Sequence, residues 1–147
     1  MIEVPVEKMP EADDLPLPSY ATPGSAGLDL LAAVGGPTVI APGGVSLVPT
    51  GIRLALPSGF EGQVRPRSGL AQKFGLTVLN APGTIDSDYR GEVKVLLINL
   101  GPAPVTIERG QRIAQLVVAR VERIRWTEGA GLPESRRGSG GFGHTGI

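Results

Sequence analysis

The sequence predicts an all-β protein, built as a sandwich, jelly roll or barrel, with one short helix. Glycine and proline recur every few residues between Pro16 and Pro104, which leaves little room for a helix of ordinary length. The segments between these residues are short and rich in Val, Ile and Leu, as is typical of strands. The chain has 147 residues, of which 41% are hydrophobic, enough for one domain with a packed core.

Six segments are predicted to be strands. In chain order they are residues 38–41, 45–48, 52–56, 93–100, 105–107 and 112–121. Residues 52–56 alternate Ile, Leu and Leu with Arg and Ala, as a half-buried strand does. Residues 93–100 are almost continuously apolar, so we expect that strand to be buried on both faces.

The short helix is expected at residues 70–74, with Ser68 placed to cap it and Gly75 to end it. From Glu128 onward the composition becomes glycine-rich and loses all periodicity. We therefore expect a β-barrel-like domain over residues 1–127, followed by a flexible C-terminal arm over residues 128–147.

Composition excludes several classes of function. Fourteen basic and fourteen acidic side chains cancel, which argues against a nucleic-acid binder or a polybasic membrane binder. The chain has no cysteine and one histidine, His144, so thiolate and multi-histidine metal centres are excluded. The N-terminus lacks the features of a signal peptide, and no apolar run could span a bilayer. We expect a soluble, cytoplasmic protein.

The stretch RPRSGLAQK, residues 65–73, is the first that folding alone does not explain. Arg67, Ser68 and Gly69 fall where a strand passes into the predicted helix. Free N–H groups at a helix start, together with Arg and Ser donors, suit a phosphate. An ordinary capped turn with a solvated arginine explains the same residues.

The stretch NAPGTIDSDYRGEVKV, residues 80–95, is predicted to be a hairpin around a compact loop. Asp86 and Asp88 lie in it beside Tyr89 and Arg90. Two carboxylates near an aromatic ring and an arginine could supply a base, a ligand to metal-bound water and a stacking surface. The alternative is that Asp and Ser simply favour turns.

Two further features stay open on the residues alone. Gln115 falls among apolar neighbours in the last predicted strand, where its amide needs partners, and a structural role explains it well. In the tail, Arg137 could meet a phosphate and Phe142 could stack on a base, although a disordered tail has the same composition. His144 is interpreted as exposed and incidental.

Taken in order, these stretches resemble the five motifs of the trimeric dUTP nucleotidohydrolases, the dUTPase family. The matching strings are SAGLDLLA (25–32), RPRSGLA (65–71), NAPGTIDSDYRGEVKV (80–95), ERGQRIAQLV (108–117) and RGSGGFGHTG (137–146). The resemblance covers nearly the whole chain. It implies a jelly-roll-like β-barrel assembled as a homotrimer, with active sites shared between subunits and the glycine-rich arm of one chain covering the site of another.

The resemblance also implies an activity: Mg²⁺-dependent hydrolysis of dUTP to dUMP and pyrophosphate. This reaction keeps uracil out of DNA and supplies dUMP for dTMP synthesis. Asp86 would activate the water that attacks the α-phosphorus, and Asp29 would orient waters of the magnesium ion.

The remaining site residues take binding roles in that family. Tyr89 would pack against the deoxyribose and exclude a 2′-hydroxyl. Phosphate contacts are implied for Arg67, Ser68, Gly69, Gln115 and Arg137. Uracil contacts are implied for Asn80, Gly83, Thr84, Ile85 and Phe142.

Three alternatives compete with this interpretation. A dCTP deaminase shares the fold, but that family has a catalytic glutamate where this sequence has Leu96. A non-catalytic nucleotide-binding module would have no need of Asp86 as a base. A purely structural jelly roll would leave the phosphate-type donors of the second and fifth motifs without a purpose.

Overall fold

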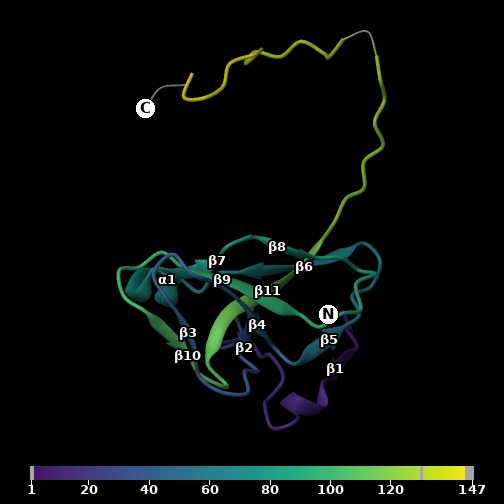
Figure 1. Cartoon of the computed structure of the whole chain (residues 1–147). Coiled ribbons are helices and arrows are strands. Elements are labelled where there is room, and N and C mark those ends of the chain that lie inside the picture. Colours follow the sequence, from purple (N-terminus) through teal and green to yellow (C-terminus); the bar gives the residue numbers. More distant parts are fainter. Residues whose placement is uncertain (1, 130, 145–147) are drawn as a thin grey trace.

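Eleven short strands and one α-helix make up most of the regular structure in residues 2–129 and 131–144, the part of the chain that the computed structural model describes (Figure 1). The strands are β1 (Val6–Lys8), β2 (Leu28–Leu31), β3 (Thr38–Ile40), β4 (Val45–Pro49), β5 (Ile52–Leu54), β6 (Phe60–Arg65), β7 (Leu76–Val78), β8 (Gly83–Ile85), β9 (Lys94–Asn99), β10 (Val105–Ile107) and β11 (Arg112–Arg120). The helix α1 spans Ser68–Phe74, and a single 3₁₀ turn, η1, spans Pro10–Ala12. The predicted all-β fold with one short helix is confirmed.

The strands form antiparallel pairs that wrap around one core. One sheet has the order β2-β11-β6-β8 and another the order β4-β9-β7, while β1 pairs with β5 and β3 with β10. Fully buried side chains from both larger sheets meet in the core, among them Leu30, Ile113, Leu76 and Leu97. Burying such aliphatic side chains is the main source of stability in a chain without disulfides.

The helix begins two residues earlier than the apolar pattern predicts. Arg67 is its N-cap residue and Ser68 its first helical residue, and no side chain caps the helix start, so the predicted capping role of Ser68 is wrong. The predicted stop is confirmed: Gly75 has φ of 68° and donates its N–H to the carbonyls of Leu70 and Ala71. A Cβ on Gly75 would also lie 2.5 Å from the backbone nitrogen of Gly101. Both the positive φ and this close approach therefore require glycine at position 75.

The predicted hairpin at residues 80–95 does not form. β8 pairs with β6, whereas β9 pairs with β4 and β7, so the loop between β8 and β9 crosses from one sheet to the other. The sequence contains turn residues at the right spacing, but it does not specify which strands they join.

The apolar strand β9 is buried on one face only. Val95, Leu97 and Asn99 point into the core, while Leu96 and Ile98 on the other face are half-buried. Asn99 is fully buried and its amide is satisfied by the carbonyls of Ile40 and Ala103, at 2.9 and 2.8 Å. The expectation of burial on both faces is therefore wrong for the isolated chain.

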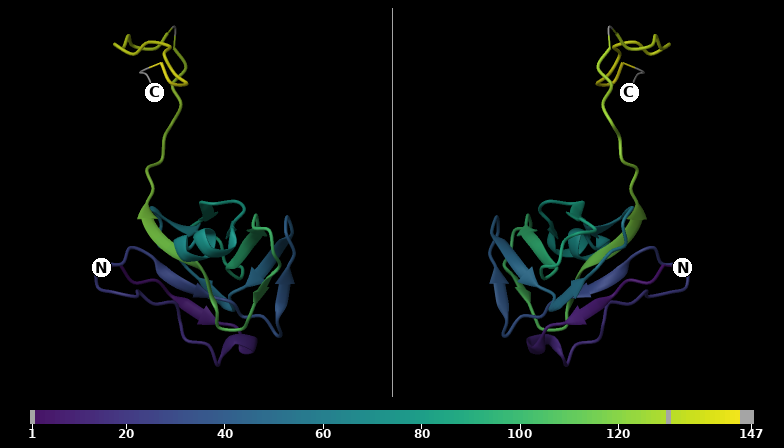
Figure 2. Two further views of the ribbon diagram at one scale, coloured as in Figure 1. Left: turned by 90° about the vertical axis from the view of Figure 1, so that its left-hand side faces the viewer. Right: turned by 90° about the vertical axis from the view of Figure 1, so that its right-hand side faces the viewer.

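The chain leaves the strands after β11. Figure 2 shows the following segment running away from the barrel in both views, and residues 121–129 contain no helix or strand. The predicted arm, 128–147, includes residues 130 and 145–147, which lie outside the described ones. No helix in the described ranges is long and apolar enough to cross a membrane.

Candidate functional site

A pocket of about 300 Å³ lies beside β8 and the loop that follows it. Six of the sequence-predicted site residues line it: Asn80, Gly83, Thr84, Ile85, Asp86 and Tyr89. All six come from the third of the five motifs. The structure thus gathers the predicted sugar and water-activating residues and all the predicted uracil contacts except Phe142 at one place.

Asn80 lies directly over the backbone of Gly83. Gly83 pairs with Val64 across β6 and β8, and a Cβ at position 83 would approach the Asn80 side-chain amide nitrogen to 3.2 Å and the Val64 Cβ to 3.4 Å. A residue without a side chain therefore lets the amide of Asn80 pack close to the strand. The arrangement presents an amide beside the backbone of an edge strand, which suits a planar ligand with hydrogen-bonding edges.

Tyr89 is held in place by its own loop. Its hydroxyl donates to the carbonyl of Glu92 at 2.9 Å, and its backbone N–H donates to the carbonyl of Asp86 at 3.1 Å. A Cβ on Gly91 would overlap the phenol group, so the ring packs against the Gly91 backbone. The Asp86 side chain, just after the end of β8, stays exposed to solvent at the pocket.

Sequence reasoning missed five residues of this pocket: Leu47, Val64, Glu92, Val93 and Lys94. Glu92 accepts a hydrogen bond from the backbone N–H of Gly51 at 3.0 Å and pairs with Lys94 at 3.3 Å. Lys94 could have been noticed, because it is the one charged residue in an otherwise apolar run and such a residue needs a reason to be there. Leu47 carries no such signal.

A second pocket, of about 420 Å³, lies where β2, β11 and β6 run side by side. Five predicted residues from the first, second and fourth motifs line it: Asp29, Arg67, Ser68, Gly69 and Gln115. Gln115 stands directly opposite Asp29 on β2 and opposite Arg65 on β6, so the three side chains share one face of the sheet.

Gln115 has a structural partner as well as a place in the pocket. Its side-chain nitrogen donates to the carbonyl of Pro66 at 3.2 Å. A Cβ on Gly27 would stand 2.7 Å from its amide oxygen, so this glycine makes room for the glutamine. The amide is thereby held beside Arg67, at the entry to the helix.

The second pocket has the chemistry of an anion site. The Nε of Arg67 lies 3.0 Å from one oxygen of Asp29, which orients the guanidinium. The first N–H groups of α1, at Ser68 and Gly69, have no acceptor within the helix. Guanidinium, hydroxyl and backbone donors together suit phosphate oxygens.

The two pockets have no lining residue in common, so a single chain does not bring all the predicted site residues together. Neither Arg137 nor Phe142 lines either pocket. Arg137 donates to the carbonyl of Gly140 at 2.8 Å within the tail, and the Phe142 ring is fully exposed. Within the described ranges no three acidic or histidine side chains gather to hold a metal ion.

Comparison with known proteins agrees with the motifs. The dUTPase family model matches residues 13–146. The deoxyuridine 5′-triphosphate nucleotidohydrolase of Rickettsia massiliae is 60% identical over 131 residues, which cover 89% of this chain and 88% of that protein. The enzyme of the same name from Caldanaerobacter subterraneus subsp. tengcongensis is 54% identical over 146 residues, 99% of each chain.

Solved structures show the same fold. A mutant dUTPase of Staphylococcus bacteriophage 80alpha with dUpNHpp superposes with a TM-score of 0.89 at 22% identity over 100% of both chains. A mutant dUTPase from phage phi11 of S. aureus, described with the coordination of a structural Mg(II) ion, gives a TM-score of 0.80 at 18% identity, covering 90% of this chain and 100% of that one. With five motifs, a family model over most of the length and relatives at this level of identity, the chain belongs to the dUTPase family.

Proposed function

We propose that this chain hydrolyses dUTP to dUMP and pyrophosphate in the cytoplasm, as a homotrimer whose active sites are shared between subunits. The observation that carries the proposal is that the two pockets offer different chemical groups. One pocket has a carboxylate, an amide and an aromatic ring for a nucleoside and its reacting phosphate, and the other has cationic and backbone donors for a phosphate chain.

Asp86 is proposed to hold and deprotonate the water that attacks the α-phosphorus. The new bond joins the water oxygen to the α-phosphorus, the bond from that phosphorus to the bridging oxygen breaks, and pyrophosphate departs. A carboxylate is a weak base for water, so placing the water in line with the leaving group supplies much of the acceleration. The solvent-exposed position of Asp86 beside the pocket supports this role.

Uracil is proposed to bind against β8, between the Asn80 amide and the backbone of Gly83, Thr84 and Ile85. A strand backbone is held by its hydrogen bonds and cannot move to make room for the 5-methyl group of thymine, so thymine is disfavoured. Polar groups paired to uracil would be mispaired by the amino group of cytosine. The Tyr89 ring, packed on Gly91, would lie where a ribose 2′-hydroxyl would collide.

The phosphate chain is proposed to bind in the second pocket, to Arg67, Ser68, Gly69 and Gln115. The C-terminal arm would then close over the bound nucleotide, with Phe142 stacking on uracil and Arg137 meeting the γ-phosphate. The high glycine content of the arm supports such a closure, because this segment must adopt its bound conformation only when substrate arrives.

Mg²⁺ fits the donors of this chain as a cation carried by the triphosphate rather than held in a protein cage. Each oxygen of Asp29 contacts one arginine and keeps a lone pair with which it can accept a hydrogen bond from a metal-bound water. Bound magnesium would neutralise the charge that builds up on the phosphates.

The homotrimer is supported by the outer face of the β4–β9 sheet. Leu47, which lines the first pocket, is 57% exposed, and its cross-strand partner Leu96 is only half-buried. Val45 and Ile98 continue the same apolar face. A neighbouring subunit on this face would cover these side chains and could bring its second pocket to the first.

The activity is tested by pyrophosphate release from dUTP, dCTP, dTTP and UTP, with Mg²⁺ and with EDTA. We expect release from dUTP alone and its suppression by EDTA. Binding of dUTP without release of pyrophosphate would favour a non-catalytic binding module. Conversion of dCTP to dUTP would favour a dCTP deaminase.

Shared sites are tested by mixing two inactive variants, Asp86→Asn and Arg67→Ala. If a site takes Asp86 from one chain and Arg67 from another, co-expressed mixed oligomers contain some intact sites and regain activity. Sites built within single chains would stay inactive in every mixture. The matched control is a cell that expresses Asp86→Asn from both plasmids, so that every oligomer lacks Asp86.

A further inference from the structure

Arg112 is placed by an irregularity at the start of β11. Regular pairing puts Gln115 opposite Asp29 and Ala114 opposite Leu30, and it would continue with Ile113 opposite Leu31. Instead Arg112 stands opposite Leu31, so the register shifts by one residue between positions 112 and 114. The extra residue is a β-bulge, a feature that turns a side chain to the other face of its sheet.

The bulge brings Arg112 to the face that carries the second pocket. Ile113 and Ala114 are both buried in succession, which breaks the normal alternation, and Arg112 is exposed on the same face as Gln115. In a regular strand, Arg112 would point into the core.

Asp29 consequently has an arginine on each of its oxygens. Oδ1 lies 3.0 Å from Arg67 Nε, and Oδ2 lies 3.3 Å from Arg112 Nη1. The carboxylate is mostly shielded, with 16% of its side chain exposed, whereas the Arg112 side chain is 56% exposed. Arg67 and Arg112 are also linked directly, since Arg67 Nη1 donates to the Arg112 carbonyl at 3.5 Å.

We propose that Arg112 is a positioning residue for the phosphate-binding pocket and acts through Asp29, an inference that rests on the proposed function. The three charged groups carry one net positive charge. Without Arg112, Asp29 would neutralise Arg67, and a triphosphate would face a neutral pair in place of a cation. Arg112 also holds the second oxygen of Asp29, which keeps the first oxygen on Arg67 Nε, and its carbonyl accepts from Arg67 Nη1. Arg67 is thereby kept in place at the pocket that it lines.

The charge argument predicts a specific kinetic effect. Arg112→Gln should raise the KM for dUTP about tenfold while kcat changes less than about twofold, because it weakens binding of phosphates throughout the reaction. Arg112→Lys keeps the charge without the planar fork and should recover part of the loss. Arg120→Gln, at the other end of β11 beside Phe60, is the matched control and should leave both constants unchanged.

Binding measured without turnover separates this inference from the proposed function. Calorimetry with dUpNHpp should show about tenfold weaker binding for Arg112→Gln, while deoxyuridine, which has no phosphate, should bind both proteins equally. Failure of the wild-type protein to bind dUpNHpp would contradict the proposed function. Equal binding of dUpNHpp by wild type and Arg112→Gln would overturn the positioning role alone.

A double-mutant cycle identifies the route of action. If Arg112 acts through Asp29, adding Arg112→Gln to Asp29→Asn should weaken dUpNHpp binding by less than about twofold further. Additive losses would show that Arg112 does not act through Asp29. Thermal unfolding of each variant, with Arg112→Lys as the milder replacement, checks that the loss does not come from the fold.

Discussion

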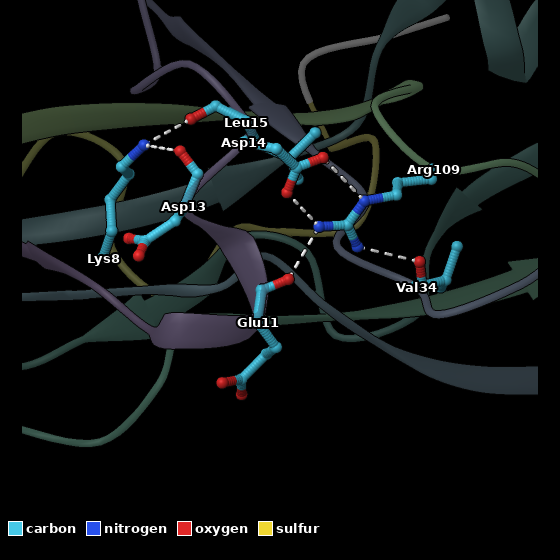
Figure 3. A network of polar contacts seen from close by, with 7 residues as sticks. All are labelled: Lys8, Glu11, Asp13, Asp14, Leu15, Val34 and Arg109. Carbon is cyan, nitrogen blue, oxygen red and sulfur yellow. Dashed lines mark hydrogen bonds and ion pairs between the residues drawn. The ribbon is translucent and has the colours of Figure 1, made fainter.

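Arg109 binds the carboxylate of Asp14 with two nitrogens of its guanidinium, although the residues are 95 positions apart in the sequence. Nε lies 3.1 Å from one carboxylate oxygen and Nη2 lies 2.5 Å from the other. The same guanidinium donates to the carbonyls of Glu11 and Val34, at 2.7 and 3.0 Å (Figure 3). The turn before β11 is thus tied to the N-terminal segment.

Lys8 holds the same segment from the other side. Its ammonium group donates to the carbonyls of Asp13 and Leu15, at 2.5 and 2.8 Å (Figure 3). The 3₁₀ turn η1 ends at Ala12, and residues 13–15 contain no helix or strand. Their backbone carbonyls are therefore satisfied by side-chain donors and not by a neighbouring strand.

The ion pair of Asp14 and Arg109 should make stability depend on pH. The hydrogen bond from Arg109 lowers the pKa of Asp14 below its ordinary value. A carboxyl with a depressed folded-state pKa stabilises the fold above its unfolded pKa, and this contribution is lost as pH falls through the folded value. Asp14→Asn should therefore lower Tm at pH 7 by about 2 °C, a small effect because the pair is exposed, and by nothing in strong acid.

Asp13→Asn is the matched control for this measurement, since it removes a neighbouring carboxylate without touching the pair. Thermal unfolding from pH 7 to pH 2 would distinguish the two. The same pH profile for both variants would mean that Arg109 contributes nothing through Asp14.

Asp86→Asn should lower kcat by roughly 10²- to 10⁴-fold, because an amide cannot take the proton of the attacking water. Binding of dUpNHpp should stay close to that of the wild type. Asp88→Asn, two positions further along the same loop, tests whether any nearby carboxylate suffices. Unchanged turnover in Asp86→Asn would remove the proposed base.

Truncation before Arg137 should leave the barrel folded and lower kcat/KM by at least about tenfold, since both the stacking ring and the γ-phosphate partner are lost. Size-exclusion chromatography and circular dichroism would check assembly and fold. A truncated protein with full activity would show that the arm takes no part in the reaction.

Gly91→Ala should weaken the selection of the deoxy sugar. The added methyl group would overlap the phenol of Tyr89 and displace the ring from its contact with the Gly91 backbone. The ratio of kcat/KM for dUTP to that for UTP should fall by roughly tenfold. Gly36→Ala, at a glycine whose Cβ would meet no neighbour, is the control, and an unchanged ratio in Gly91→Ala would exclude Tyr89 as the sugar sensor.

Local pattern was sufficient for much of the fold. The strands at β3, β4, β5, β9, β10 and β11 were predicted because short apolar runs between turn residues have few other solutions. β1, β2, β6, β7 and β8 were given no bounds, although a strand was expected to lead into the helix and a hairpin was expected at residues 80–95. β6, for example, contains Glu, Gly and Gln, which break the apolar pattern. Such segments become strands because neighbouring strands supply hydrogen-bond partners, which a local pattern does not record.

The candidate site was predictable for a different reason. Residue types that suit chemistry, such as Asp86 beside Tyr89 or Arg67 beside Ser68, lie close together in the chain, and the five motifs occur in the family's order. Glu92 and Lys94 were not predicted as site residues, because their place in the pocket depends on a loop that crosses between sheets.

By itself, the sequence determined the fold class, the family and the kinds of chemical group available, because these depend on residue type and local spacing. Only the tertiary structure decided how those groups are distributed: Asp86 in one pocket, Asp29 and Arg67 in another, with Arg112 turned toward Asp29 by a bulge. The physical reason is that pocket membership follows from strand pairing and register. A shift of one residue moves a side chain to the opposite face of a sheet, and contacts far along the chain determine that register.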